Sequence, residues 1–180
     1  INIFQGERVR LRAVEPGDWQ AHWAWDQDTE GARMGYEIPF PGSPAGTQAW
    51  AERESKRVPE ADAFRFQIET LDKVQVGTLN THSCDLRCGT FTYGLAVMQQ
   101  HQRKGYASEA IRLVLRYYFD ERRYQKCTAT VYAFNEPSQR LHERLGFTLE
   151  GRLRRMIYSG GDYHDVLYYG ITKEEAAASW

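Results

Sequence analysis

The sequence has few cysteines, almost no net charge and no long apolar run. Its three cysteines are an odd number, and a chain of 180 residues needs no disulfide staples, so we expect reduced thiols. The net charge of −1 gives no case for a nucleic acid or an anionic membrane as the main partner. No apolar run approaches the roughly 18 residues that a membrane span needs. The first residues also lack the plan of a signal peptide, so the cytoplasm is the compartment that we expect.

The stretch HSCDLRC raises the question of a metal site. It contains His82, Cys84 and Cys88 within seven residues. A C-x3-C spacing without a second ligand pair downstream is not the spacing of a zinc finger. We therefore expect reduced thiols in a hairpin loop, and no metal.

The first half of the chain predicts one strand, two helices and a two-strand meander. Alternating charged and apolar residues in ERVRLRAV indicate a half-buried strand, and Asp18 is a suitable N-cap for the next helix. The glycine- and proline-rich stretch MGYEIPFPGSPAG predicts a loop. The expected elements are strand 7–14, a tryptophan-rich helix from Asp18, loop 34–46, helix 47–56, and strands 64–69 and 74–81.

The second half predicts alternating strands and helices followed by a hairpin. The clearest helix has apolar residues at i, i+3, i+4 and i+7. Gly146 stands where a C-cap glycine belongs, and SGGD closes the terminal hairpin. No repeat or linker is visible, so residues 1–180 are expected to form a single α+β domain. The expected elements are strand 90–98, helix 107–119, strand 126–134, helix 137–145, and hairpin strands 147–158 and 163–172.

The stretch QRKGYASEA, residues 102–110, places a glycine and two basic residues between a strand and a helix. The first N–H groups of a helix lack internal partners and, with the positive end of the helix dipole, form an anion site. Gly105 permits the required turn, and Arg103 and Lys104 add positive charge. No Lys-Ser or Lys-Thr follows the glycine, so this is not a Walker A loop. An exposed basic turn that binds nothing is the alternative.

A second segment, NEPSQRLHERLGF, follows the next strand about thirty residues later. Together with Gln102-x-x-Gly105-x-Ala107, it makes the chain resemble the GNAT superfamily of acyl-CoA-dependent N-acetyltransferases. The first segment resembles the family's pyrophosphate loop, and the second resembles its other cofactor-contacting segment. Within the superfamily the chain is most similar to the RimJ/RimL branch. Its opening stretch GERVRLRAVEPGD also resembles the first strand of that branch. The resemblance spans nearly the whole chain and is strongest over residues 90–147.

The resemblance implies both a fold and a reaction. The fold is a three-layer α/β/α arrangement, a mixed, mostly antiparallel sheet of six to seven strands flanked by about four helices. The reaction moves acetyl from acetyl-CoA to a primary amine by direct attack in a ternary complex, without a metal. The RimJ/RimL branch acetylates the N-terminal amine of ribosomal proteins, so a protein N-terminus is the expected acceptor. A homodimer is a tendency of the family.

Other functions fit the same residues. The acceptor could instead be a small amine, such as a polyamine, an amino acid or an aminoglycoside. A non-catalytic acyl-CoA-binding module would bind the cofactor without turnover. A nucleotide-binding protein could use the same anion site, but no metal-holding serine or threonine follows Lys104.

The resemblance also implies which residues contact the cofactor. The pantetheine arm would pair with the main chain of Leu95 and Val97, and backbone N–H groups there could hold the thioester oxygen. The pyrophosphate would rest on amides of residues 103–107. Asn135 matches an amide side chain near the cofactor, and it is equally suited to cap the short helix. The expected cofactor-binding residues are Leu95, Ala96, Val97, Gln102, Arg103, Lys104, Gly105, Tyr106, Ala107, Asn135 and Ser138.

Acetyl transfer needs a neutral amine and a proton for the departing CoA thiolate. Ser138 occupies the position where the family places a hydroxyl near the cofactor sulfur, so it is the first candidate for the acid, with an ordinary serine in the first turn of a helix as the alternative. Many relatives carry a tyrosine acid where this chain has His142, which is either a second candidate or a packing residue. The positions that carry a glutamate base in some relatives hold Thr90 and Ile157. His82 is the candidate base, acting through water, with an ordinary loop histidine as the alternative.

The acceptor pocket is expected between the loop that begins at Met34, the end of strand 126–134 and the terminal hairpin. Aromatic side chains with a carboxylate suit a cationic amine. Each of these aromatics could equally fill the core behind the hairpin. The candidate acceptor-binding residues are Met34, Tyr36, Phe40, Tyr132, Tyr158, Tyr163 and Asp165.

Overall fold

The strands predicted from the sequence form one mixed sheet in the order β1-β2-β3-β4-β5-β7-β6. The computed structural model describes all 180 residues. Every neighbouring pair is antiparallel except β4 and β5, which are parallel. This confirms the expected α+β class. The strands are β1 Val9–Arg12, β2 Arg65–Thr70, β3 Gln75–Asp85, β4 Thr90–Val97, β5 Lys126–Tyr132, β6 Thr148–Ser159 and β7 Asp162–Thr172.

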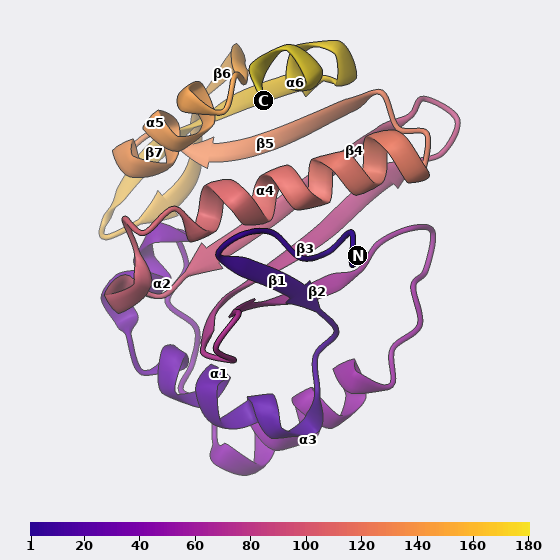
Figure 1. Cartoon of the computed structure of the whole chain (residues 1–180). Coiled ribbons are helices and arrows are strands. Elements are labelled where there is room, and N and C mark those ends of the chain that lie inside the picture. Colours follow the sequence, from indigo (N-terminus) through magenta and orange to yellow (C-terminus); the bar gives the residue numbers. More distant parts are fainter.

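Six α-helices accompany the sheet (Figure 1). Helix α4 has the most buried residues and crosses in front of the sheet in Figure 1. Helices α1 and α3 pack together at the lower end of the molecule in that view. No helix is long and apolar enough to cross a membrane. The helices are α1 Trp19–Asp26, α2 Thr29–Met34, α3 Pro44–Ser55, α4 Tyr106–Arg116, α5 Glu136–Arg144 and α6 Lys173–Ser179.

The structure contains two helices that the sequence did not predict, α2 and α6, and one predicted loop is shorter than expected. The carboxylate of Asp28 caps α2 by accepting the N–H of Gly31, and Thr172 begins α6 with a capping box. The predicted loop 34–46 was wrong at its end because Ser43 caps α3 and Pro44 fits its first turn. The loop therefore ends three residues earlier.

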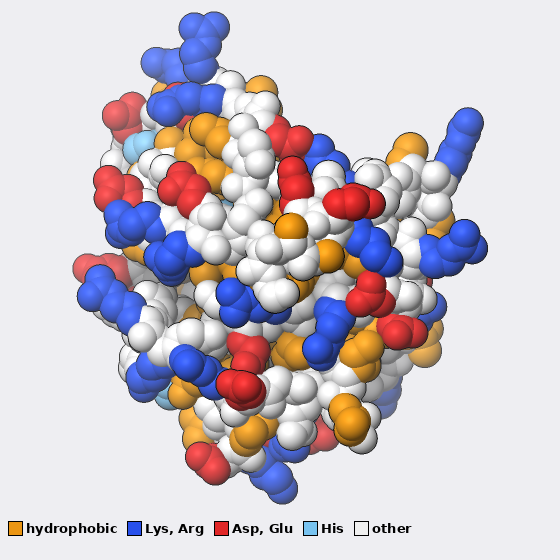
Figure 2. Space-filling model, turned by 45° about the horizontal axis from the view of Figure 1, so that its top comes forward, with side chains coloured by type: hydrophobic (Ala, Val, Ile, Leu, Met, Phe, Trp, Pro, Cys, Tyr) orange, Lys and Arg blue, Asp and Glu red, His pale blue; other side chains and the backbone are white.

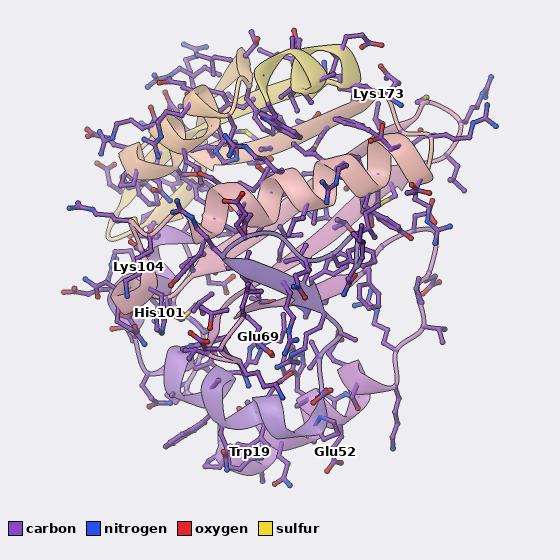
Figure 3. The ribbon with its side chains drawn as sticks, in the orientation of Figure 1. Trp19, Glu52, Glu69, His101, Lys104 and Lys173 are labelled. Atoms are coloured by element: carbon purple, nitrogen blue, oxygen red, sulfur yellow. The ribbon has the colours of Figure 1, made fainter.

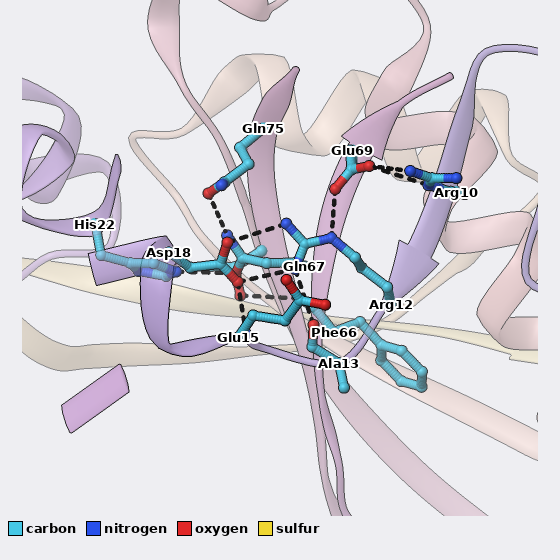
Figure 4. A network of polar contacts seen from close by, with 11 residues as sticks. Arg10, Arg12, Ala13, Glu15, Asp18, His22, Phe66, Gln67, Glu69 and Gln75 are labelled. Carbon is cyan, nitrogen blue, oxygen red and sulfur yellow. Dashed lines mark hydrogen bonds and ion pairs between the residues drawn. The ribbon is translucent and has the colours of Figure 1, made fainter. Parts of the chain in front are cut away.

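Asp18 does not cap α1 with its side chain, contrary to the sequence prediction. Its buried carboxylate instead accepts hydrogen bonds from the Arg12 guanidinium and from the N–H of Glu15. Arg12 also pairs with Glu69 on β2, which Arg10 contacts as well (Figure 4). An ion pair with Arg12, six positions earlier on β1, thus engages the residue that sequence alone assigns to a cap. The network ties β1 and β2 to the segment that leads into α1.

The core lies between α4 and the sheet. Ile111, Val114 and Leu115 on α4 are almost completely buried, as their spacing predicts. Just beyond α4, in the π-helical turn Tyr117–Glu121, Tyr118 stacks on Phe91 of β4, with ring centroids 4.3 Å apart. Burial of each such side chain contributes about 1.5–3 kcal/mol. This packing fixes the start of β4 relative to α4, and so positions the turn that joins them.

The parallel pair β4–β5 is short, and this shapes the site. Only Thr90–Thr92 of β4 pair with Lys126–Thr128 of β5. Beyond these residues β5 continues against β7 as far as Tyr132. Residues 93–97 of β4 therefore pair with β3 on one side and with no strand on the other.

The terminal hairpin forms where the sequence predicts it. Gly160 and Gly161 make its two-residue turn with φ of 61° and 88°, the values that a type I′ turn requires. Gly146 has φ of 92° and ends α5, as a C-cap glycine does. Across the face in Figure 2, basic and acidic side chains are interspersed, without a broad field of one sign.

Candidate functional site

The turn between β4 and α4 presents a row of free backbone donors. Gly105 adopts the left-handed conformation with φ of 81°, and no side chain caps the helix. None of the N–H groups of residues 103–108 donates a hydrogen bond within the chain. These donors lie at the positive end of α4, where an anion is stabilised. Sequence analysis predicted a glycine turn at this helix N-terminus, and the structure has one; that it binds an anion stays a prediction.

Two residues that sequence analysis missed hold this turn against β1. The carboxylate of Glu109 accepts the N–H groups of Glu7, Arg8 and Val9 at 3.0, 2.8 and 2.7 Å. The Arg8 guanidinium donates to the carbonyl of Lys104 at 2.9 Å. A glutamate in the first turn of α4 was visible in the sequence, but its partners lie about a hundred residues away. The cradle is therefore braced from behind.

Basic side chains surround the same turn. Figure 3 shows Lys104 beside His101 at the N-terminal end of α4. Partial burial and the nearby Lys104 charge lower the pKa of His101, so it is neutral at pH 7. Arg103 and Lys104 are exposed and remain free to meet an anion.

The open side of β4 carries the main-chain groups of Leu95 and Val97. The N–H of Met98 donates to the carbonyl of Val76, and bonding alternates along an antiparallel ladder. Leu95 and Val97 therefore direct their N–H and C=O groups away from β3, whereas Ala96 directs its groups toward it. The side-chain amide of Gln102 donates to the Val97 carbonyl at 2.9 Å. Gln102 thus braces the turn from within.

Asn135 caps α5. Its side-chain oxygen accepts the N–H of Ser138 at 3.2 Å, which is the capping role that the sequence allowed. Its side-chain nitrogen lies 3.5 Å from the carbonyl of Met34. Asn135 therefore links the start of α5 to the end of α2.

His142 is buried, and both of its ring nitrogens are occupied. Nδ1 lies 2.7 Å from the carbonyl oxygen of Ser138, which can only accept, so Nδ1 carries the proton. Nε2 lies 2.7 Å from the hydroxyl of Tyr93 and accepts from it. Burial lowers the pKa of His142, which favours the neutral ring. Of the two acid candidates, Ser138 has the freer proton. Its hydroxyl lies 3.4 Å from Nδ1, and a protonated Nδ1 cannot accept a hydrogen bond from it.

His82 lies apart from Ser138. It is exposed on β3, opposite Thr92, rather than beyond the strand as the sequence predicted. Its Nδ1 lies 3.0 Å from the hydroxyl of Ser83. From Thr92 to Val97 the strand rises roughly 16 Å, and Ser138 follows the far end of β5. The structure thus does not bring the candidate base to the candidate acid.

The thiols of HSCDLRC are also placed differently from the prediction. Cys84 lies on β3, and only Cys88 lies in the turn that follows. No group of three or more histidine, cysteine or acidic side chains is arranged to hold a metal ion.

Several acceptor candidates gather around one hollow of about 440 Å³ between the end of α2 and the β6–β7 hairpin. Tyr36 and Tyr158 both line it. The rings of Tyr36 and Tyr132 meet edge-on, with centroids 5.2 Å apart, and the centroids of Tyr158 and Tyr163 are 5.1 Å apart. The lining residues are Arg33, Tyr36, Glu37, Ile38, Tyr158, Ser159 and Gly160.

Asp165, Phe40 and Met34 do not line this hollow. Asp165 lines a second hollow along β6, where it accepts hydrogen bonds from the Arg152 guanidinium and the N–H of Arg155. Phe40 is fully exposed in the loop before α3, and Met34 reaches the site through its carbonyl. The sequence could not separate the two hollows, because both lie on the same hairpin.

Comparisons with known proteins agree with this arrangement. The family described as the acetyltransferase (GNAT) domain matches residues 8–148. The uncharacterized N-acetyltransferase YokL of Bacillus subtilis is 41% identical over 175 residues, covering 97% of this chain and 96% of YokL. YdaF of the same organism, named provisionally as a ribosomal N-acetyltransferase, is 25% identical over 178 residues, covering 94% of this chain and 93% of YdaF.

A solved structure of high similarity is spermidine N-acetyltransferase from Vibrio cholerae in complex with CoA and spermine. It has a TM-score of 0.82 and 22% identity, and the alignment covers 96% of this chain and 99% of that one. The likeness confirms the fold. With the family match and the relative at 41% identity, it leads to one conclusion: this chain belongs to the GNAT family and is an acetyl-CoA-dependent N-acetyltransferase.

Proposed function

We propose that this enzyme acetylates the N-terminal amine of a protein or peptide, with acetyl-CoA bound in the opening beside β4. The observation that carries the cofactor position is the junction of two sets of free groups. The open edge of β4 ends at Val97, and after the short segment 98–102 the chain reaches the free N–H groups of residues 103–108. A pantetheine arm suits the first and a pyrophosphate suits the second.

The cofactor then contacts the chain mainly through the backbone. Leu95 and Val97 pair with the amides of the pantetheine arm, and one of these N–H groups stabilises the charge that grows on the thioester oxygen. The pyrophosphate takes the amides from Arg103 to Ala107, and Arg103 and Lys104 screen its charge. Gln102 and Asn135 keep the hydrogen bonds that shape these segments.

The chemistry requires little from side chains. The acceptor amine attacks the thioester carbon as a neutral amine, its C–N bond forms, and the C–S bond breaks. Ser138 relays a proton to the departing thiolate and regains one from water, and the amine loses its proton to that water, which connects with solvent. A dedicated base is unnecessary when the acceptor is an N-terminal amine, because its ordinary pKa of about 8 leaves a useful neutral fraction at pH 7.

The charge of the acceptor hollow favours a peptide N-terminus over a polyamine. Its lining holds one carboxylate, Glu37, and one guanidinium, Arg33, beside Tyr36 and Tyr158. A polyamine carries several ammonium groups and would be favoured by a set of carboxylates, whereas a peptide brings one amine. The name of YdaF points to the same class of acceptor. A small amine is the second candidate, since the similar Vibrio cholerae enzyme was solved with spermine.

A thiol-release assay across N-terminal peptides, polyamines and aminoglycosides tests the acceptor, and calorimetry with CoA tests the cofactor site. We expect turnover on peptides, and loss of CoA binding in Gly105→Glu. Ser138→Ala should lower kcat by about 100-fold while CoA still binds. Turnover on polyamines alone would replace the peptide proposal, and unchanged CoA binding in Gly105→Glu would overturn the cradle.

A further inference from the structure

We propose that a bulged segment of β6 binds an acidic stretch of the acceptor peptide, a few residues after the reacting amine. We call this segment the basic ridge and define it as Arg152, Leu153, Arg154, Arg155 and Met156. The ridge lines a second hollow of about 630 Å³ together with Asp165. The inference rests on the proposed peptide acceptor and adds the property that selects among peptides.

The ridge exists because β6 carries extra residues that β7 does not match. Leu153 pairs with Val166, but the next pair along the strand is Ile157 with His164. Three residues of β6 therefore stand opposite the single residue Asp165. A bulge of this kind bends the strand and redirects its side chains. Because β6 is the edge of the sheet, those side chains face solvent.

The ridge has a surplus of positive charge. Asp165 is the one carboxylate that lines this hollow. Both Asp165 oxygens accept hydrogen bonds, one from the Arg152 side chain and one from the N–H of Arg155. These two contacts lower the pKa of Asp165, so it stays ionised and occupied. Neither Arg154 nor Arg155 makes an ion pair, and Arg155 rests only over the ring of Tyr163, at 4.9 Å. Two guanidinium groups are thus left for an anionic partner.

The ridge is continuous with the acceptor hollow. Tyr163, beneath Arg155, contacts Tyr158, which lines that hollow. Arg155 lies three positions before Tyr158 on the strand, a span of about 10 Å or less. An extended peptide covers this distance in about three residues. Acidic side chains at about the fourth to sixth positions of the acceptor would therefore reach the guanidinium groups.

Apolar groups on the ridge favour a peptide over a nucleic acid. The side chains of Leu153 and Met156 are 41% and 57% exposed among the arginines. They offer contacts for the aliphatic parts of a peptide, while a nucleic acid would need a longer basic stripe to neutralise several phosphates. The net charge of −1 supplies no such field.

Three peptides that share their first three residues test the ridge. Positions four to six are Glu, Gln or Lys, and thiol release gives kcat and KM for each. We expect kcat/KM to fall by about fivefold from Glu to Gln, mostly through KM, and to fall further for Lys, with the difference shrinking as salt rises. In the double variant Arg154→Ala, Arg155→Ala the three peptides should become equal. Arg87→Ala, an exposed arginine in the β3–β4 turn, is the matched control.

Failure of this inference differs from failure of the proposed function. If all three peptides are acetylated equally by the unaltered enzyme, the ridge is overturned and the peptide acceptor stands. If no peptide is acetylated although CoA binds, the acceptor proposal fails, and anisotropy of a labelled Glu peptide then measures the ridge alone. Binding that the double variant loses supports the surface, whereas absent binding or tighter binding of a single-stranded RNA overturns it. The charge-reversed Arg154→Glu should shift preference toward the Lys peptide.

Discussion

The hydroxyl of Tyr93 lies 2.7 Å from Nε2 of His142, and this hydrogen bond joins β4 to α5 beside the place where β4 and β5 separate. Both partners are buried, and the other ring nitrogen is bonded to the Ser138 carbonyl. The contact therefore holds α5 against β4 and fixes the position of Ser138 relative to the open edge of β4. The Nδ1 proton of His142 is held by the Ser138 carbonyl, and Nε2 accepts from Tyr93, so neither nitrogen is free to donate to the reaction.

Removing the Tyr93 hydroxyl should weaken folding more than catalysis. Tyr93→Phe leaves Nε2 of His142 buried and unpaired, which costs about 1–3 kcal/mol in the free energy of unfolding. We expect kcat to stay within about threefold in this variant, because neither group donates the reaction proton. Urea unfolding and thiol release measure the two effects, with the exposed Tyr168→Phe as the control. A loss of kcat by 100-fold at unchanged stability would show that the pair itself transfers the proton.

Stability should fall as the solution is acidified below pH 6.5. Burial lowers the pKa of both His142 and His22 beneath their unfolded values, so the unfolded chain binds more protons in this window. Since the unfolded state takes up protons, stability rises with pH up to about 6.5 and is lost as pH falls toward the folded pKa values. Thermal melts from pH 8 to pH 5 measure this. The slope should flatten in His22→Gln, in which Gln67 keeps a polar partner.

The buried carboxylate of Glu69 should matter more than an exposed one. Glu69→Gln removes the charge that two guanidinium groups, of Arg10 and Arg12, share on β1. Both arginines are partly exposed, so we expect a loss of about 2–3 kcal/mol, below the value for a fully buried pair. Glu136→Gln, which breaks the exposed pair with Arg140, should change stability by less than about 0.5 kcal/mol. Equal effects would contradict the role given to the network in Figure 4.

The turn at Gly105 should tolerate no side chain. Its φ of 81° disfavours every other residue, and an added Cβ would lie 2.5 Å from a guanidinium nitrogen of Arg8. Gly105→Ala should therefore distort the row of free N–H groups and lower CoA affinity by about tenfold, from strain of about 1–2 kcal/mol. Gly151→Ala, where a Cβ meets no atom within 4 Å, is the control. Calorimetry with CoA compares the two, and equal affinities would refute the need for this conformation.

Local patterns carried most of the fold. The apolar spacing of α4, the glycines of the SGGD turn and Gly146 each determine structure within a few residues, so the sequence alone predicted them. Short helices were harder: α2 and α6 have six and seven residues, too few for a clear period, although Asp28 and Thr172 were visible as caps.

Long-range pairing limited the prediction of the site. The glycine turn before α4 was predicted because it depends on one glycine and one helix start. The functions of Asp18, Glu109 and Asp165 were not found, because their partners are supplied by other strands or by a bulge. The hydrogen-bond partner of Nε2 of His142 is Tyr93, 49 positions away. Proximity of this kind follows from the tertiary fold rather than from spacing.

Because β4 and β5 pair over only three residues, the middle of the sheet contains main-chain groups that no strand pairs with. Such exposed groups normally invite another chain. In the proposed complex, amides of the cofactor would supply the missing hydrogen bonds, so the cofactor would act as a removable part of the sheet. Amide exchange at Leu95 and Val97 would then report occupancy directly, and the melting temperature would rise with CoA concentration.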